Sequence, residues 1–259
     1  MPRLREIYIY PYAGWWGRPW TTMPEPWDDV TLDRDAAARS ARRVTESVSQ
    51  ALRSLAVEAP RGQLMLDLMV GEGDGVELEF TERFLDPSDR GTGRVRVPMG
   101  FRNLSPTERA RQLGEVVVEA ALRRAELHDW DVAAVEEALC AVADGGFRAY
   151  AAGPWKVTRD RKRQVRLCGE IADDGFLRMW AEIDDAATGG GSRRSEEIVG
   201  WTWLENVARA AKKMRLTGSS MLTFGAGSND YEFHAVVDLD TGAVTRTPPN
   251  PVVLSYPGA

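Results

Sequence analysis

The side chains best suited to metal binding are few in this chain. It has two histidines and two cysteines, and no pair of them stands at a spacing such as CxxC or HExxH: His128, His234, Cys140 and Cys168. His128 and Cys140 are separated by a break that we expect between two helices. The sequence therefore predicts no metal site and no cofactor.

Three groups could act as the polar side chains of a pocket, namely Asp67, His128 and His234. Asp67 stands in residues 64–70, a predicted strand that is apolar on both faces, so we expect its carboxylate to be buried. A buried carboxylate needs a partner or has a raised pKa. An ion pair with an arginine, a place at the sheet edge and a functional acid all fit this position. His234 alternates with apolar residues in another predicted strand, as a surface residue or a general base.

Two short motifs match phosphate-binding or catalytic sequences but are better interpreted as turns. Gly71, Gly73 and Gly75 form GxGxG between two predicted strands, whereas a phosphate loop needs a strand followed by a helix. Asp240-Thr-Gly-Ala243 matches the aspartic protease motif, but that chemistry needs two such aspartates. A protease of this kind also needs most of a domain after the motif, and 16 residues remain here. No GxSxG nucleophile elbow is present.

A basic run over residues 156–166 contains six cations in eleven residues and spans a predicted turn between strands. We name as candidate binding residues of this basic hairpin Trp155, Arg159, Arg161, Lys162 and Arg163. Three interpretations are open. The hairpin tip is simply solvated, or it docks on an acidic protein surface such as the acidic half of this chain, or it binds phosphate or nucleic acid with Trp155 as a stacking platform.

The N-terminal segment, residues 1–30, is an aromatic arm that carries seven large rings in its first 27 residues. Its candidate binding residues are Tyr10, Tyr12, Trp15, Trp16 and Trp20. Tyr and Trp bury large areas, so the arm either seals the core of its own chain or forms an exposed surface for a partner.

The net charge is −6, and all of it lies in residues 1–150, where 25 acids face 19 arginines. Arginine outnumbers lysine 29 to 4, which is typical of a GC-rich, bacterial genome, although bidentate recognition of phosphate or carboxylate is the functional alternative. The acidic balance argues against general nucleic-acid binding. No window is apolar enough for a transmembrane helix, and the first residues do not match a secretory signal. With two cysteines, we expect a reduced cytoplasmic protein without membrane contact.

Periodicity predicts helices and strands in both halves of the chain. We expect helices at 33–56, 105–127, from 132 to Gly145, and 202–214. Their predicted caps are Thr31 or Asp33, Ser105 and Thr202. We expect strands at 5–12, 63–70, 75–84, 94–99, 155–158, 163–172, 175–184, 194–200, 219–225, 231–239 and 243–247. Residues 71–75 and 238–242 are predicted to join neighbouring strands as tight turns.

Strands clustered in threes with short connections predict an α+β fold of antiparallel sheets packed on amphipathic helices. The order of three strands and a helix recurs about 100 residues later. Either the two halves are similar βββα units, or this repeated order is a coincidence. We predict an N-terminal half at 1–146 and a C-terminal half at 147–259, with a single continuous domain as the alternative.

These observations favour a non-catalytic, intracellular protein-binding protein of the adaptor, chaperone or immunity type. Its partner would be another protein, bound by a sheet face or by the aromatic arm. The alternative is a small-molecule-binding protein or enzyme with an apolar pocket between helix and sheet. Convergence of Asp67, His128 or His234 with aromatic rings in one cavity would favour that alternative.

Overall fold

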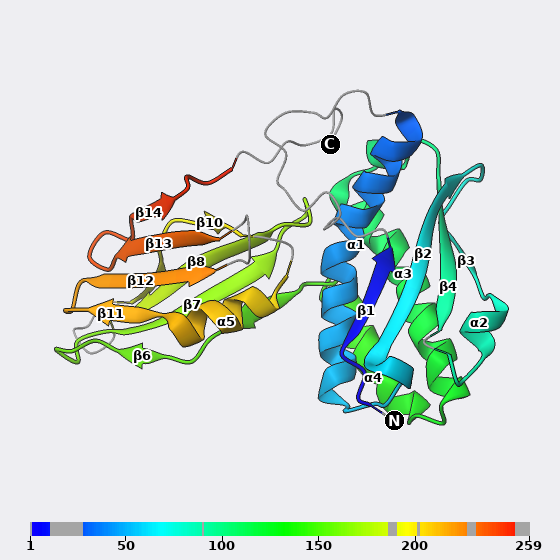
Figure 1. Cartoon of the computed structure of the whole chain (residues 1–259), viewed down its shortest axis with the longest axis horizontal. Helices are drawn as coiled ribbons and strands as arrows, with labels where there is room; N and C mark the ends of the chain where they lie inside the picture. Colours follow the sequence, from blue (N-terminus) through cyan, green and yellow to red (C-terminus); the bar gives the residue numbers. More distant parts are fainter. Residues whose placement is uncertain are drawn as a thin grey trace.

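The structure is a computed structural model of the chain and describes residues 2–10, 28–89, 91–185, 191–200, 203–226 and 232–251. These residues form helices and three sheets in two parts that lie side by side, one containing the long helices and one built mostly of strands (Figure 1). The predicted α+β class is confirmed. None of the described helices combines the length and the apolar character needed to cross a bilayer.

The first part is a four-stranded sheet with helices packed on one face. Its strands are β1 (Glu6–Tyr10), β2 (Gln63–Gly71), β3 (Glu77–Glu79) and β4 (Thr92–Pro98), in the spatial order β1-β2-β4-β3. Its helices are α1 (Asp29–Ser54), the short α2 (Glu82–Leu85), α3 (Pro106–Leu127) and α4 (Val132–Asp144). Strands β1 and β2 are parallel and α1 connects them, which makes a βαβ unit.

The predicted hairpin between residues 63–70 and 75–84 is wrong. Strand β4 lies between β2 and β3, and it pairs with β2 in parallel and with β3 in antiparallel fashion. Strand β2 is long and mostly apolar, whereas only three residues of the second segment form a strand, with Glu77 and Glu79 exposed. A strand with solvent-exposed charged side chains is suited to the edge of a sheet, and an apolar strand is suited to its centre. This difference in burial outweighs the short connection, which favoured a hairpin.

The helix starts follow local capping chemistry. Ser105 caps α3 by accepting a hydrogen bond from the backbone of Glu108 at 3.2 Å, as predicted. Helix α1 begins earlier than predicted because Asp28 caps it, with 2.8 Å between its carboxylate and the Thr31 nitrogen. Asp33, a predicted cap, is instead buried and accepts backbone hydrogen bonds from Gly100 and from Arg102. Thr202, the predicted cap of the last helix, lies outside the described residues.

The second part consists of two antiparallel sheets and one helix, α5 (Glu205–Lys213). One sheet contains β5 (Tyr150–Ala152), β6 (Lys156–Val157), β7 (Gln164–Ile171), β8 (Leu177–Asp184), β9 (Ser192–Arg194) and β10 (Ile198–Val199). The other contains β11 (Arg215–Thr217), β12 (Met221–Ala226), β13 (Phe233–Asp238) and β14 (Val244–Thr247). The predicted tight turn at 238–242 is confirmed, because the Asp238 carboxylate accepts hydrogen bonds from the backbone of Asp240 and of Thr241.

Each part has its own hydrophobic core. The first core runs from Leu4 to Phe147 and the second from Ala149 to Leu239. The parts share the order of three strands and a helix, but not the pairing, since consecutive strands β7 and β8 are neighbours whereas β2 and β3 are not. Whether each part folds as a separate domain stays a prediction.

Helix α1 joins the two parts. The Arg39 guanidinium lies 5.0 Å from the centre of the Phe176 ring, and Gln50 donates a hydrogen bond of 3.0 Å to the Tyr150 carbonyl. The turn between β7 and β8 touches the helix backbone at Gly175, where a Cβ atom would lie 2.6 Å from the Arg39 carbonyl oxygen. Only glycine fits this contact, and its φ of +80° also favours glycine.

Candidate binding groove

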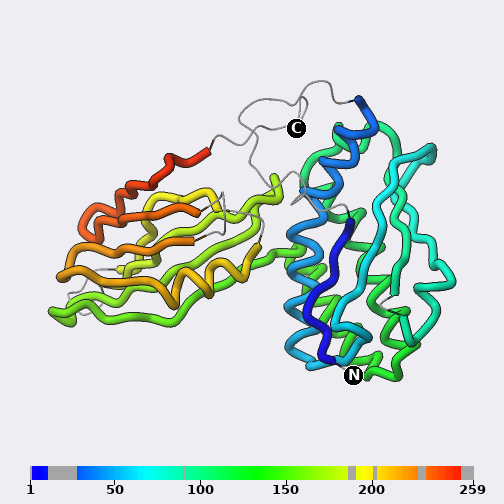
Figure 2. The backbone as a smooth tube through the Cα atoms, viewed as in Figure 1, coloured from blue at the N-terminus to red at the C-terminus, as the bar shows by residue number. Residues whose placement is uncertain are grey.

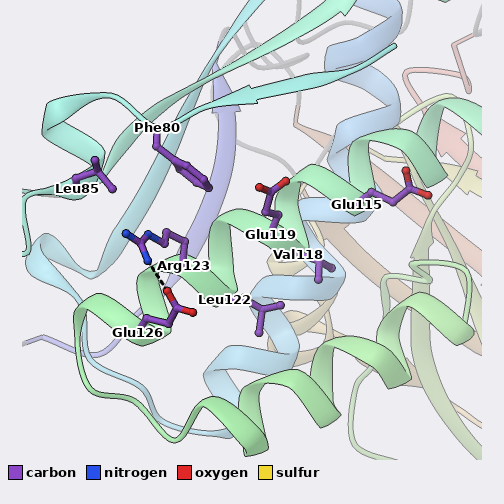
Figure 3. Close-up of a pocket in the computed structure, with 8 residues that line it drawn as sticks. All are labelled: Phe80, Leu85, Glu115, Val118, Glu119, Leu122, Arg123 and Glu126. Carbon is purple, nitrogen blue, oxygen red and sulfur yellow. Dashed lines mark hydrogen bonds and ion pairs between the residues drawn. The ribbon is translucent and has the colours of Figure 1, made fainter.

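An open groove of about 760 Å³ lies on the first part, between α3 and the segment of β3 and α2 (Figure 3). We call it the α3 groove. Its lining residues are Phe80, Leu85, Glu115, Val118, Glu119, Leu122, Arg123 and Glu126. Of the elements that line it, α2 lies on the side of the first part that faces away from the second part (Figure 1).

The floor of the α3 groove is apolar. Val118 and Leu122 are four residues apart on α3, so their side chains are neighbours on one face of the helix. Phe80 and Leu85 line the groove on the side of Glu119 and Arg123, and Val118 and Leu122 line it on the other side of α3 (Figure 3). Phe80, Val118 and Leu122 pack against the first core, whereas Leu85 is 38% exposed. The floor is therefore an apolar surface that continues outward from the core.

The rim of the α3 groove is acidic. Three carboxylates and one guanidinium line it, which gives a formal charge of −2. Arg123 pairs with Glu126 at 2.6 Å, and Glu115 pairs at 2.5 Å with Arg111, which lies outside the lining. Glu119 is exposed and forms no ion pair with any residue that the structure describes. An incoming cation would therefore find Glu119 available.

One wall of the groove is held by Arg124, which is only 2% exposed. Its guanidinium donates hydrogen bonds to the carbonyls of Phe84, Asp86 and Asp89, at 2.6, 3.2 and 2.9 Å. These carbonyls belong to α2 and to the loop that follows it. Arg124 therefore ties the α2 wall to α3, and burial lowers the pKa of its guanidinium.

His128 takes part in the same arrangement. Its Nε2 atom lies 2.6 Å from Nη2 of Arg124, and its ring stacks on Trp130. A guanidinium can only donate, so Nε2 must accept and the imidazole must be neutral. Burial and the charge of Arg124 lower the pKa of His128, which keeps the ring in this form. His128 is thus a support of the groove wall and does not line the groove.

The other two candidate pocket groups lie elsewhere. Asp67 is half-buried on the outer face of the first sheet, in register with Tyr10 and with Arg94. The expected burial of Asp67 is therefore wrong, because α1 and α3 cover only the opposite face of the sheet and Met69 on the outer face is 48% exposed. His234 is exposed on β13, and Phe233 and Ala235 on either side are buried, as the alternation predicted. The three groups therefore come from three separate elements.

The aromatic arm is described only as far as Tyr10, a residue that is 43% exposed at the end of β1. Tyr12, Trp15, Trp16 and Trp20 lie outside the described residues. The arm as a binding surface therefore stays a prediction.

The basic hairpin is a turn between β6 and β7, as predicted. Trp155 is 38% exposed and packs against the guanidinium of Arg166. Arg159, Arg161 and Lys162 are exposed at the tip. Arg163 is different, because it forms ion pairs with Asp185 at 2.8 Å and with Asp240 at 2.6 Å.

A polar cluster on the outer face of the β7–β8 sheet was not predicted. The Tyr150 hydroxyl donates a hydrogen bond to Sγ of Cys168 at 3.2 Å, and Cys168 lies 3.4 Å from the Glu182 carboxylate. Burial raises the pKa of the Cys168 thiol and raises the pKa of Tyr150 to about 12. A thiol held in its protonated form is a poor nucleophile, so this cluster does not have the electrostatics of a catalytic cysteine.

Among the described residues, no three His, Cys, Asp or Glu side chains come together as metal ligands would. No protein-family model matches the chain, and neither a curated protein nor a solved structure is significantly similar to it.

Sequence reasoning missed the α3 groove. One signal was present, because Val116, Val117 and Val118 are consecutive in a helix and cannot all face one core. The first two are buried and Val118 points to the groove. The opposite wall comes from residues 80–85, about 35 positions earlier, and no local pattern shows that they meet.

Proposed function

We propose that this chain is a non-catalytic protein-binding protein of the cytoplasm and that the α3 groove receives a segment of its partner. The observation that carries the proposal is the combination of an apolar floor with an acidic rim in an open groove. An exposed apolar patch rimmed by polar groups is typical of protein–protein interaction sites. An adaptor, chaperone or immunity-type role would use such a surface.

The rim defines the chemistry of the partner. A segment that presents two or three apolar side chains beside lysine or arginine would fill the floor and pair with Glu119 and its neighbours. Charge pairs at an exposed rim contribute more to association rate and specificity than to affinity. We therefore expect the apolar contacts to supply most of the binding free energy and the rim to select basic partners.

The alternative function, an enzyme or small-molecule binder, has less support. Its polar groups would be Asp67, His128 and His234, and these come from separate elements. Of the three, His128 has the most specific contacts, and its role is to hold Arg124.

Selection from a random peptide display library on the immobilised full chain tests the proposal. We expect enriched peptides to pair apolar side chains with Arg or Lys and to bind with a Kd of about 1–100 µM, as for a small interface. Leu122→Lys should weaken this binding at least tenfold, because it adds a cation to the floor. The matched control is Met69→Lys, which places the same side chain on the exposed outer face of the first sheet.

Two results would contradict the proposal. Enrichment of acidic peptides would show that the rim does not select the partner. Equal binding of basic peptides to wild type and to the Leu122→Lys variant would place the binding site outside the α3 groove.

A further inference from the structure

The basic hairpin has the chemistry that the α3 groove requires of its partner. Val157 is 54% exposed and Trp155 is 38% exposed, so both present apolar surface to solvent. Arg159, Arg161 and Lys162 follow within a few residues, and none of them forms an ion pair with a residue that the structure describes. The hairpin thus combines exposed apolar side chains with exposed cations.

The hairpin is already folded in the shape in which it would bind. The backbone nitrogen of Thr158 donates to the Arg163 carbonyl at 3.0 Å, and the Thr158 hydroxyl donates to the Asp160 carboxylate at 2.7 Å. That carboxylate also accepts a hydrogen bond from the backbone of Lys162. A preorganised loop loses less conformational entropy on binding than a flexible one.

The hairpin does not fill the groove of its own molecule. Strand β6 and the turn after it lie at one end of the molecule, and α2 and α3 lie at the other (Figures 1 and 2). Two cations of the hairpin form ion pairs, and both bind within the second part: Arg163 with Asp185 and Asp240, and Arg166 with Glu182. A contact between hairpin and groove therefore requires two molecules.

We propose that the α3 groove of one molecule binds the basic hairpin of a second copy of this chain. Trp155 and Val157 would lie on the floor formed by Phe80, Leu85, Val118 and Leu122. The cations at the tip would pair with Glu115, Glu119 and Glu126. This inference rests on the proposed function, because it names the occupant of the same groove.

The symmetry of this contact has a direct consequence. Groove and hairpin are different surfaces, so a single contact is heterologous and leaves the second groove and the second hairpin of the pair free for another contact. Such contacts close into a ring or continue as an open chain. A single hairpin in a groove buries little area, so we expect a Kd on the order of 10–1000 µM that weakens as salt rises.

Sedimentation equilibrium of the full chain tests the proposal with two complementary variants. The groove-blocked variant carries Glu119→Arg and Leu122→Lys. The hairpin-blocked variant carries Val157→Glu, Arg161→Glu and Lys162→Glu, all at exposed positions. Thermal unfolding of each variant confirms that it is folded before association is measured.

The expected pattern has three parts. Wild type shows a mass that rises with concentration and falls when the salt concentration is raised. Each variant alone stays monomeric up to about ten times the Kd of wild type. A mixture of the two variants forms a 1:1 dimer and nothing larger, because one variant supplies an intact hairpin and the other an intact groove.

Other outcomes overturn the inference. A wild-type chain that stays monomeric at about 1 mM excludes a second copy as the occupant, and the peptide selection then decides separately whether the groove binds other proteins. Association of wild type without dimerisation of the mixed variants places the contact elsewhere. Binding of a twelve-nucleotide oligo-dT that competes with self-association and is lost in the hairpin-blocked variant assigns the hairpin to nucleic acid.

Discussion

Two buried arginines of the first part, Arg124 and Arg39, show two different ways of keeping a charge away from water. Arg124 is surrounded by backbone carbonyls and the neutral imidazole of His128, with no carboxylate of the described residues within ion-pair distance. Arg39 pairs with the Asp35 carboxylate at 2.7 Å. One site thus uses neutral dipoles and the other an opposite charge.

A glycine of positive φ accompanies each arginine. A Cβ at Gly91 would lie 3.0 Å from the guanidinium carbon of Arg124, and Gly175 meets the backbone of Arg39. In each case the glycine has no side chain, so its loop can approach the helix more closely than any other residue would permit. Arg124 thereby fastens the groove wall to α3, and Arg39 lies at the contact between the two parts of the molecule.

The two sites respond differently to pH. A guanidinium keeps its charge throughout the ordinary pH range, and carbonyl groups do not titrate. The imidazole of His128 stays neutral near neutral pH because burial and Arg124 lower its pKa. A carboxylate can take up a proton. Burial raises the pKa of Asp35 to about 7, against the opposing effect of Arg39. The Arg39 site therefore contains a group that titrates near neutral pH because it is buried.

Replacing Arg124 by methionine should have the largest effect. The change leaves the carbonyls of Phe84, Asp86 and Asp89 without their donor, and we expect a loss of about 3–5 kcal/mol in the free energy of unfolding. Urea unfolding measures it. The control is Arg123→Met, next to it but in an exposed pair with Glu126, for which we expect about 0–1 kcal/mol. Equal losses in the two variants would show that the carbonyl contacts of Arg124 do not stabilise the fold.

A pH series with Asp35→Asn tests the contrast between the two sites. The folded state holds the Asp35 proton more tightly than the unfolded chain, whose carboxyl has a pKa near 3.8. The stability due to Asp35 is therefore full below about pH 4 and is lost as pH rises towards 7. Asparagine does not titrate. From pH 5 to pH 8 we expect wild type to lose about 2–3 kcal/mol relative to the variant in urea unfolding. Parallel pH profiles of the two proteins would contradict the raised pKa.

The smallest expected effect belongs to Gly175→Ala. The added Cβ meets the Arg39 carbonyl oxygen, so the β7–β8 turn must move away from α1. The control is Gly146→Ala, which has a φ of +67° but no atom within 4 Å of its Cβ, so it measures the backbone cost alone. We expect Gly175→Ala to lose about 1–2 kcal/mol more than the control in urea unfolding. Equal losses would mean that the contact with α1 is not tightly packed.

The helices were predictable because their signals are local. Ser105 and Glu108 mark the start of α3, and Gly145 stands at the end of α4, each within one turn of the helix concerned. The pairing order of the first sheet was not predictable in this way. The order depends on whether β3 or β4 lies beside β2. The short connection between β2 and β3 favoured β3, which was the wrong choice.

The candidate site shows the same division. The basic hairpin was found from composition alone, because six cations around one turn form a continuous signal. The α3 groove was not found from composition, because its walls come from α3 and from residues 80–85, which are distant in sequence. The role of His128 was not predictable either, because it depends on Arg124. Arg124 is one helical turn from His128, but the carbonyls that it binds in α2 and in the loop after it are about 40 residues away in sequence.

The amino-acid sequence was sufficient for the class of fold, for most helix and strand positions and for the acidic character of the first half. These properties depend on residues within a few positions of one another or on simple counts. The order of strands in the first sheet, the solvent-facing side of Asp67, the α3 groove and the buried arginine sites depended on the tertiary structure. They arise where segments distant in sequence compete for the same buried surface, and only packing of the whole chain settles that competition.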